Sequence, residues 1–204
     1  LKAFSRDWVD TAYWPQFAAT GINDERIGRE YGFCELSPVQ IDSLLCSPRL
    51  KDDAAREFAR WMTLNENYLA GNIADEAWME ALLGRLADEK DALSASALIK
   101  YMAEPLLAPS VQGKYDTQLL ALAASHELPT VRTQLLRTLA ARAIEPAVVD
   151  SLYEIWRRAD SPLLSANDYT TLAYELAVRL PAQADSILAT QRTRITNPDR
   201  LAQF

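Results

Sequence analysis

The sequence contains little of what most catalytic and cofactor-binding sites require. Its 204 residues include one His, two Cys and six Gly. One His cannot supply the paired imidazoles of a catalytic zinc site, and two cysteines cannot complete a four-ligand site by themselves. The few glycines form neither a phosphate-binding loop nor a dinucleotide-binding turn, and no nucleophile-elbow motif is present. We therefore expect no catalytic residue, metal site or cofactor within this segment.

Long apolar runs and an excess of positive charge are also missing. No run approaches the roughly 20 apolar residues of a membrane-spanning helix, so we predict no membrane span. The net charge is −7, whereas proteins that bind nucleic acids need a cationic surface to neutralise phosphates. We therefore expect no nucleic-acid partner.

The two ends of the sequence indicate a piece of a longer polypeptide. The chain has no initiator Met and no signal-peptide pattern, and it ends just inside a new helix. Any targeting segment would then precede Leu1, so the sequence leaves the compartment open between the cytoplasm and the cell envelope.

What the sequence does contain is helical periodicity, which is clearest after Ser165. Ser165 and Asp168 have the spacing of a capping box, with Asp in place of the usual Glu. Pro181 cannot continue that helix but can begin the next one. Asn197-Pro198-Asp199 repeats the pattern of a helix start. The apolar residues of the first of these helices recur at helical spacing and form one stripe: Tyr169, Leu172, Ala173, Leu176 and Leu180.

The same pattern begins at Pro38. In the helix expected over 51–69, an apolar face is predicted to end at Gly71. That face consists of Phe58, Trp61, Met62, Tyr68 and Leu69. Other helices are expected over 38–45, 75–86, 93–107, 115–125, 129–139, 146–156, 165–180 and 181–195, with Pro105 kinking or ending its helix. Junctions therefore recur, and a helix pair spans about 35–40 residues.

These features predict an all-α fold, an irregular HEAT-like superhelix of antiparallel helix pairs with about nine helices. The domain prediction is an N-terminal segment over 1–36 and a helical domain over 37–204. The N-terminal segment is rich in aromatic residues and lacks a sustained helical period. Within it, the stretch from Arg29 to Leu36 is expected to contain a short strand.

The single His lies in a sequence that only begins like a zinc-protease motif. His126-Glu127-Leu128-Pro129-Thr130 has Thr where the second His of H-E-x-x-H must stand, and Pro129 would break the helix that carries the pair. We therefore interpret His126 as a cation at a helix end or as an exposed cap. Cys34 and Cys46 are expected to be buried thiols, with a bridge between them left open.

Three polar residues, Asn65, Glu66 and Asn67, interrupt the amphipathic helix over 51–69. One interpretation is a solvated face or a hydrogen bond between helices. The other is a polar contact in a binding groove.

Three segments together resemble one protein family. The first is Trp61-Met62-Thr63-Leu64-Asn65-Glu66-Asn67-Tyr68-Leu69-Ala70-Gly71-Asn72-Ile73, which resembles a W-x-x-L-x-E-N-(aromatic or Met)-L-x-G-x-I stretch. The second is Tyr31-Gly32-Phe33 followed by Leu36. The third joins Asn167-Asp168-Tyr169-Thr170 through Leu176-Ala177 with Gln191-Arg192 and Asn197-Pro198-Asp199-Arg200. In this order they are similar to the C-terminal part of zinc aminopeptidases of the aminopeptidase N family, the gluzincins.

The resemblance implies that the parent chain is a zinc aminopeptidase, a metallopeptidase that removes N-terminal residues from peptides. Its H-E-x-x-H zinc site would lie in an earlier domain, and 1–36 would end a preceding β-sandwich. The helical domain would then shape or cap access to the active site, with the catalytic domain of the same polypeptide and the peptide substrate as partners. The zinc motifs themselves are not in this sequence. Substrate-facing residues would be Asn65, Glu66 and Arg200, the last pairing with a peptide carboxylate or with an acid of the neighbouring domain.

The alternative hypothesis is that the chain is a free-standing helical-repeat scaffold that binds another protein. An upstream H-E-x-x-H favours the peptidase, whereas an independent start codon near Leu1 favours the scaffold.

Overall fold

A computed structural model describes residues 16–20, 24, 26–27, 32–50 and 53–204. Arg29, Tyr31 and Lys51, where expected elements begin, lie outside these residues. The described residues form two short strands, β1 (Gln16–Ala18) and β2 (Phe33–Glu35). They also form ten α-helices: α2 (Pro38–Cys46), α3 (Ala54–Leu69), α4 (Asp75–Ala87), α5 (Ala92–Tyr101), α6 (Asp116–Ser125), α7 (Pro129–Arg142), α8 (Pro146–Arg158), α9 (Ala166–Arg179), α10 (Ala184–Arg194) and α11 (Pro198–Gln203).

The predicted all-α class is confirmed, because helices dominate the described residues and the strands form only one small parallel pair. The strand expected before Leu36 is present as β2, whose Cys34 pairs with Phe17 of β1. None of the described helices is long and apolar enough to cross a membrane.

Contacts divide the chain into two compact units, Leu1–Ala81 and Leu82–Phe204. The division falls within α4. The expected domain boundary after residue 36 remains a prediction about the parent polypeptide.

Helix starts follow the local chemistry that the sequence predicts. Ser37 and Gln40 form a reciprocal capping box at α2, and Ser165 and Asp168 form one at α9. Asn197 accepts a hydrogen bond from the backbone N–H of Arg200 at the start of α11. The helices that prolines open include α2, α7 and α8, because the first helical N–H needs no partner.

Two proline predictions need correction. Helix α5 already ends at Tyr101, so Pro105 does not end it but begins a short 3₁₀ helix, Pro105–Leu107. Pro181 likewise begins a 3₁₀ turn, Pro181–Gln183, and α10 starts only at Ala184. In both cases a proline fits the first turn of a tighter helix for the same reason that it fits that of an α-helix.

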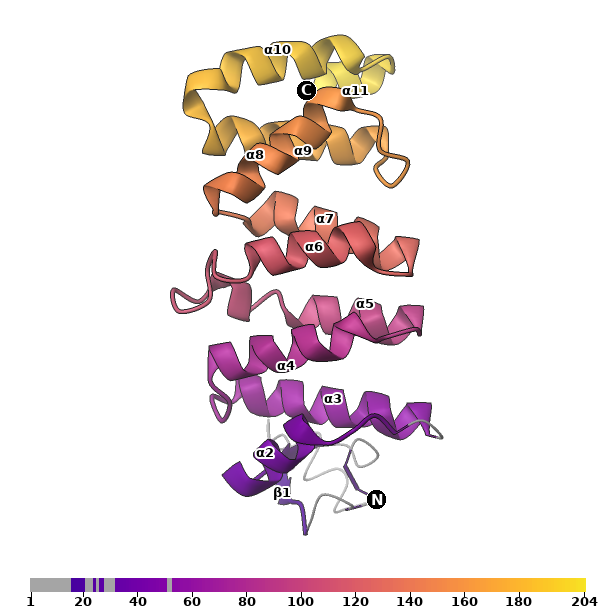
Figure 1. Ribbon diagram of the computed structural model, residues 1–204, viewed down its shortest axis with the longest axis vertical. Coiled ribbons are helices and arrows are strands. Elements are labelled where there is room, and N and C mark those ends of the chain that lie inside the picture. The colour runs from indigo at the N-terminus through magenta and orange to yellow at the C-terminus, as the bar shows by residue number, and fades with distance from the viewer. Residues whose placement is uncertain (1–15, 21–23, 25, 28–31, 51–52) are drawn as a thin grey trace, which may run out of the picture. The chain divides into compact units, whose positions relative to one another are not determined.

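The second unit is a two-layer array of helices (Figure 1). Helix α7 packs against both α5 and α9, and α6 packs against α8. Between the layers, α6 contacts α7, α8 contacts α9, and α9 contacts α10. Each helix from α5 to α9 therefore contacts the next helix, the next but one, or both, as in stacked helical hairpins. Leucines that are at most 1% exposed fill the space between layers: Leu119, Leu135, Leu139, Leu152 and Leu176.

In the first unit, α3 packs against α2 and against β2. The expected apolar face is only partly correct, because Trp61 is buried and Met62 and Tyr68 are half-buried, whereas Phe58 is 41% exposed and Leu69 is 62% exposed. The buried side combines apolar and polar residues: Glu57, Ala59, Arg60, Trp61, Thr63, Leu64 and Asn67. The prediction missed the polar part because it counted apolar residues only, and three strongly polar side chains lie in this core.

Candidate functional site

Asn67 of α3 joins this helix to strand β2. Its Oδ1 accepts a hydrogen bond of 3.1 Å from the backbone N–H of Leu36. Its Nδ2 donates to the carbonyl of Cys34 at 2.9 Å and to that of Thr63 at 2.9 Å. The Asn72 amide completes the set by donating to Oδ1. All four hydrogen-bonding positions of the Asn67 side chain are therefore used, and the side chain is 0% exposed.

Other residues of the Trp61–Ile73 segment also have structural tasks. Helix α3 ends in a Schellman motif, in which Gly71 donates to the Tyr68 carbonyl and Asn72 to that of Asn67. Gly71 has a φ of +83°, a value that glycine adopts at little cost. The Trp61 ring lies 5.8 Å from that of Trp78, centroid to centroid. The residues of the Trp61–Ile73 segment that carry the family resemblance therefore serve mainly to hold β2, α3 and the start of α4 together.

Asn65 and Glu66, two of the expected substrate-facing residues, lie on the same helix and are half-buried. Within the described part of the chain, neither side chain has a hydrogen-bond or ion-pair partner. Burial raises the pKa of the Glu66 carboxyl above its usual range. These two side chains are therefore available for a contact, unlike Asn67.

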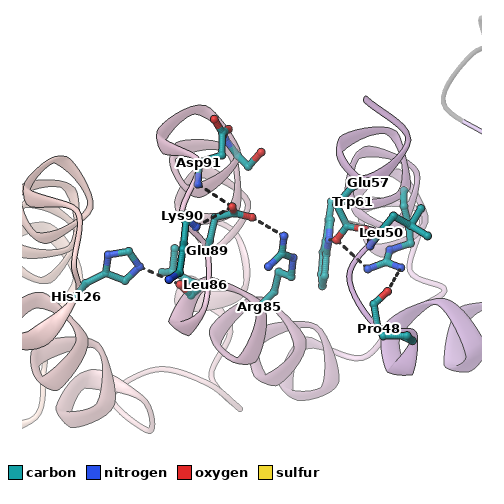
Figure 2. A network of polar contacts seen from close by, with 12 residues as sticks. Pro48, Leu50, Glu57, Trp61, Arg85, Leu86, Glu89, Lys90, Asp91 and His126 are labelled. Carbon is teal, nitrogen blue, oxygen red and sulfur yellow. Dashed lines mark hydrogen bonds and ion pairs between the residues drawn. The ribbon is translucent and has the colours of Figure 1, made fainter. Parts of the chain in front are cut away.

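A buried ion pair fixes the start of α3 (Figure 2). Glu57 Oε1 accepts hydrogen bonds of 2.9 Å from Arg60 and 2.9 Å from the Trp61 indole, and Oε2 accepts one of 3.1 Å from the Leu50 backbone. Arg60 in turn donates to the Pro48 carbonyl at 3.2 Å. A buried charge pair is tolerated when further hydrogen bonds satisfy both partners, so this network holds the segment before α3 in place.

A second buried carboxylate stabilises the connection from α4 to α5 (Figure 2). Glu89 accepts a hydrogen bond from Arg85 and two from the backbone N–H groups of Lys90 and Asp91, the latter at 2.9 and 2.8 Å. Asp116 does the same for the connection from α7 to α8, because its Oδ2 accepts from Ile144 and Glu145. Both acids satisfy loop N–H groups that would otherwise be unpaired.

His126 lies at the end of α6, as expected, but it is only 7% exposed. The alternative of an exposed cap is therefore wrong, because the side chain is buried. Nδ1 accepts a hydrogen bond from the Leu128 N–H, which places the ring proton on Nε2, and Nε2 donates to the Leu86 carbonyl at 3.0 Å (Figure 2). His126 is thus a neutral bridge between α4 and the α6–α7 turn.

The cysteines differ in their surroundings. Cys34 is buried, and burial raises the pKa of its thiol to about 11. Cys46 is exposed, so the prediction of two buried thiols is wrong for this residue. Both are free, and no disulfide joins them. The described residues also contain no group of three or more His, Cys, Asp or Glu side chains that could hold a metal ion.

The C-terminal helices surround a pocket of about 290 Å³. The described lining residues include two arginines, Arg194 and Arg200, and no acid. The remaining polar lining residues are Tyr169, Thr170, Gln191, Thr196 and Asn197. Tyr169, Thr170, Gln191, Asn197 and Arg200 all belong to the third segment of the family resemblance. The fold thus gathers distant parts of that segment around one cavity, which we take as the candidate site.

The wall of this pocket is fixed by Gln191 of α10, which is 3% exposed. Its Oε1 accepts a hydrogen bond of 2.9 Å from the Trp156 indole of α8, and its Nε2 donates to Thr170 of α9 at 3.1 Å. One side chain therefore links three helices. Nothing in the sequence pattern indicates this role, because a Gln in a polar helix is ordinarily exposed.

The two arginines of the pocket differ in what they bind. The Arg194 guanidinium donates to the carbonyls of Trp156 at 2.8 Å and Arg157 at 3.0 Å, and thereby satisfies the end of α8. Arg200, the third expected substrate-facing residue, is exposed. Its guanidinium has no hydrogen-bond or ion-pair partner among the described residues. Because a guanidinium binds carboxylates in a bidentate geometry, Arg200 is the residue of this pocket that is free to bind an anion.

The three expected site residues thus fall in different units, Asn65 and Glu66 in the first and Arg200 in the second. No protein-family model, no curated protein and no solved structure matches the chain.

Proposed function

We propose that this chain is the C-terminal helical domain of a zinc aminopeptidase of the aminopeptidase N family, in which it shapes access to an active site located in another domain. It would act by its surface, excluding misplaced substrates and orienting the correct one, and such orientation can contribute several kcal/mol to catalysis. In this proposal the zinc ligands and the catalytic side chains lie in that other domain.

The observation that carries this proposal is the meeting of segments that the family resemblance names separately. Leu36 and Cys34, beside the expected tyrosine–glycine–aromatic strand, are hydrogen-bonded to Asn67 of the tryptophan-to-isoleucine segment. The parts of the closing segment likewise meet at one pocket. These contacts support the proposal because they give residues of separate segments a shared structural role.

Within this proposal, Arg200 binds a carboxylate, supplied either by the catalytic domain of the same polypeptide or by the peptide substrate. Asn65 and Glu66 offer polar contacts to the peptide. The pocket favours an anion because its described lining has two cations and no acid.

The test uses the full polypeptide that contains this chain. Its kcat and KM for an alanine chromogenic substrate and for a longer peptide are compared between Arg200→Ala and the control Arg192→Ala, an exposed arginine outside the pocket lining. We expect zinc-dependent hydrolysis that is weakened by Arg200→Ala and not by Arg192→Ala. If Arg200 binds a carboxylate of the peptide, Arg200→Ala raises KM only for the longer peptide. If Arg200 binds an acid of the catalytic domain, the substitution affects the hydrolysis of both substrates. A polypeptide without upstream zinc motif or activity would contradict the proposal.

The free-standing scaffold remains the alternative outcome of the same experiment. Stacked hairpins of the kind seen in the second unit are common in both classes. An independent start codon near Leu1, together with the absence of peptidase activity, would favour the scaffold.

A further inference from the structure

Helices α5 and α7 together carry an unusual charge for this chain. The protein has 28 acidic and 21 basic residues. These two helices, by contrast, contain Lys100, Arg132, Arg137 and Arg142 and no acid. Helices α5 and α7 pack against each other in the second unit (Figure 1), and three of these cations, Lys100, Arg137 and Arg142, line the groove between them.

A groove of about 410 Å³ lies between the two helices. Its lining contains three of the cations, Lys100, Arg137 and Arg142, and none of the described lining residues is acidic. The lining also contains the apolar residues Ile99, Ala103 and Ala141, of which Ile99 is buried, and Gln134 bridges the helices by donating to the Ser96 hydroxyl at 2.8 Å. The groove therefore combines fixed polar groups, small apolar side chains and positive charge.

One carboxylate shows how an arginine of this surface is used. Asp168 of α9 accepts hydrogen bonds of 2.7 and 3.0 Å from the Nε and Nη2 of Arg137. Within the described part of the chain, Lys100 and Arg142 have no ion-pair partner. Two cations of the groove are thus left for an external anion of the kind that Arg137 already binds.

We propose that the α5–α7 groove binds an extended acidic peptide segment, with Lys100 and Arg142 pairing with its carboxylates. A nucleic acid fits less well, because two free cations neutralise few phosphates while the chain as a whole carries a charge of −7. An acidic peptide carries fewer charges and can place its backbone over the apolar part of the groove. This inference does not depend on the proposed peptidase role.

The test measures binding of a fluorescein-labelled, acetylated hexaglutamate peptide by fluorescence anisotropy at several NaCl concentrations. The chain is compared with Lys100→Glu/Arg142→Glu and with the control Arg158→Glu/Arg192→Glu, which reverses two exposed cations outside the groove. We expect saturable binding that weakens with salt. The groove variant should lose at least about tenfold in affinity, and the control should stay within about twofold.

Several outcomes would overturn the proposal. These are no saturable binding, equal losses in both variants, or tighter binding of an oligonucleotide of the same charge. Sedimentation that shows salt-dependent self-association, abolished by the groove variant, would mean that a second copy of the chain occupies the groove. Lys100→Gln/Arg142→Gln serves as a second variant: unchanged circular dichroism with weakened binding supports the proposal, and unchanged binding contradicts it.

Discussion

The buried face of α3 and the C-terminal pocket both arise from segments of the same family resemblance, but they use their polar residues differently. On α3, all four hydrogen-bonding positions of the Asn67 side chain are occupied by partners within the fold. At the pocket, Gln191 holds three helices together, while Arg200 stays exposed without a described partner. A polar motif residue therefore indicates function only when the fold does not use its hydrogen-bonding groups.

The largest effect should come from Asn67→Ala. The substitution leaves the buried N–H of Leu36 and carbonyl of Cys34 without their partner, so we expect a loss of roughly 3–5 kcal/mol in the free energy of unfolding. Urea denaturation measures it. Asn65→Ala on the same helix is the matched control and should change stability by less than about 0.5 kcal/mol. Similar values for both would show that the Asn67 hydrogen bonds do not hold β2 to α3.

The next largest effect is expected for Gln191→Leu. The change keeps much of the volume but removes the acceptor of the buried Trp156 N–H, which should cost about 2 kcal/mol. Gln183→Leu, at an exposed position before α10, should be nearly neutral. Unfolding measured by Trp fluorescence would reveal the difference. An unchanged unfolding midpoint for Gln191→Leu would show that Gln191 does not stabilise the wall of the pocket.

A smaller effect that depends on pH should follow from Asp168→Asn. The hydrogen bonds from Arg137, followed by those from Ser165, lower the pKa of Asp168 to about 2. A lowered pKa in the folded state stabilises the protein above the unfolded pKa of roughly 3.9, and this stabilisation disappears as the pH falls toward 2. Because Arg137 is 55% exposed, the pair and the cap together should contribute about 1 kcal/mol at pH 7.

Stability curves of the two proteins between pH 7 and pH 2 check this prediction. They should converge toward the acidic end. A difference that stays constant with pH would contradict the assignment of the stabilisation to the ionised carboxylate.

The smallest effect on stability is expected for Arg200→Ala, since its guanidinium has no described partner. The free energy of unfolding should change by less than about 0.5 kcal/mol, although function in the full polypeptide should suffer. Thermal unfolding of Arg200→Ala and Gln191→Leu, measured side by side, distinguishes a residue that binds a ligand at this pocket from one that supports its fold. A marked destabilisation by Arg200→Ala would mean that this arginine supports the fold instead of binding a ligand.

Local chemistry made much of the helical framework predictable. Pro129 and Pro146 mark helix starts, Ser165 and Asp168 form a capping box, and Gly71 ends α3. Each of these features acts within a few residues, so the sequence displays it directly. Four of the five residues of the predicted α9 stripe, Tyr169, Leu172, Ala173 and Leu176, are buried for the same reason, whereas Leu180 follows the end of the helix and is half-buried.

Features that depend on distant partners were not predictable. Strand β1 has only three residues, and its parallel pairing with β2 is a non-local contact. Burial of Glu57, Glu89, Asp116 and Gln191 depends on backbone groups or side chains placed by the fold, whereas most acids of a helical protein face water. Glu57 and Glu89 do have a local indication, since Arg60 and Trp61 follow Glu57 and Arg85 precedes Glu89 at helical spacing.

The most direct test of the account is to assay the full polypeptide and the isolated 204-residue chain side by side for bound zinc and for hydrolysis of an alanine chromogenic substrate. We predict stoichiometric zinc and turnover in the full polypeptide, and neither in the isolated chain. Zinc and turnover in the isolated chain, or their absence from the full polypeptide, would contradict the claim that these helices serve an active site located elsewhere.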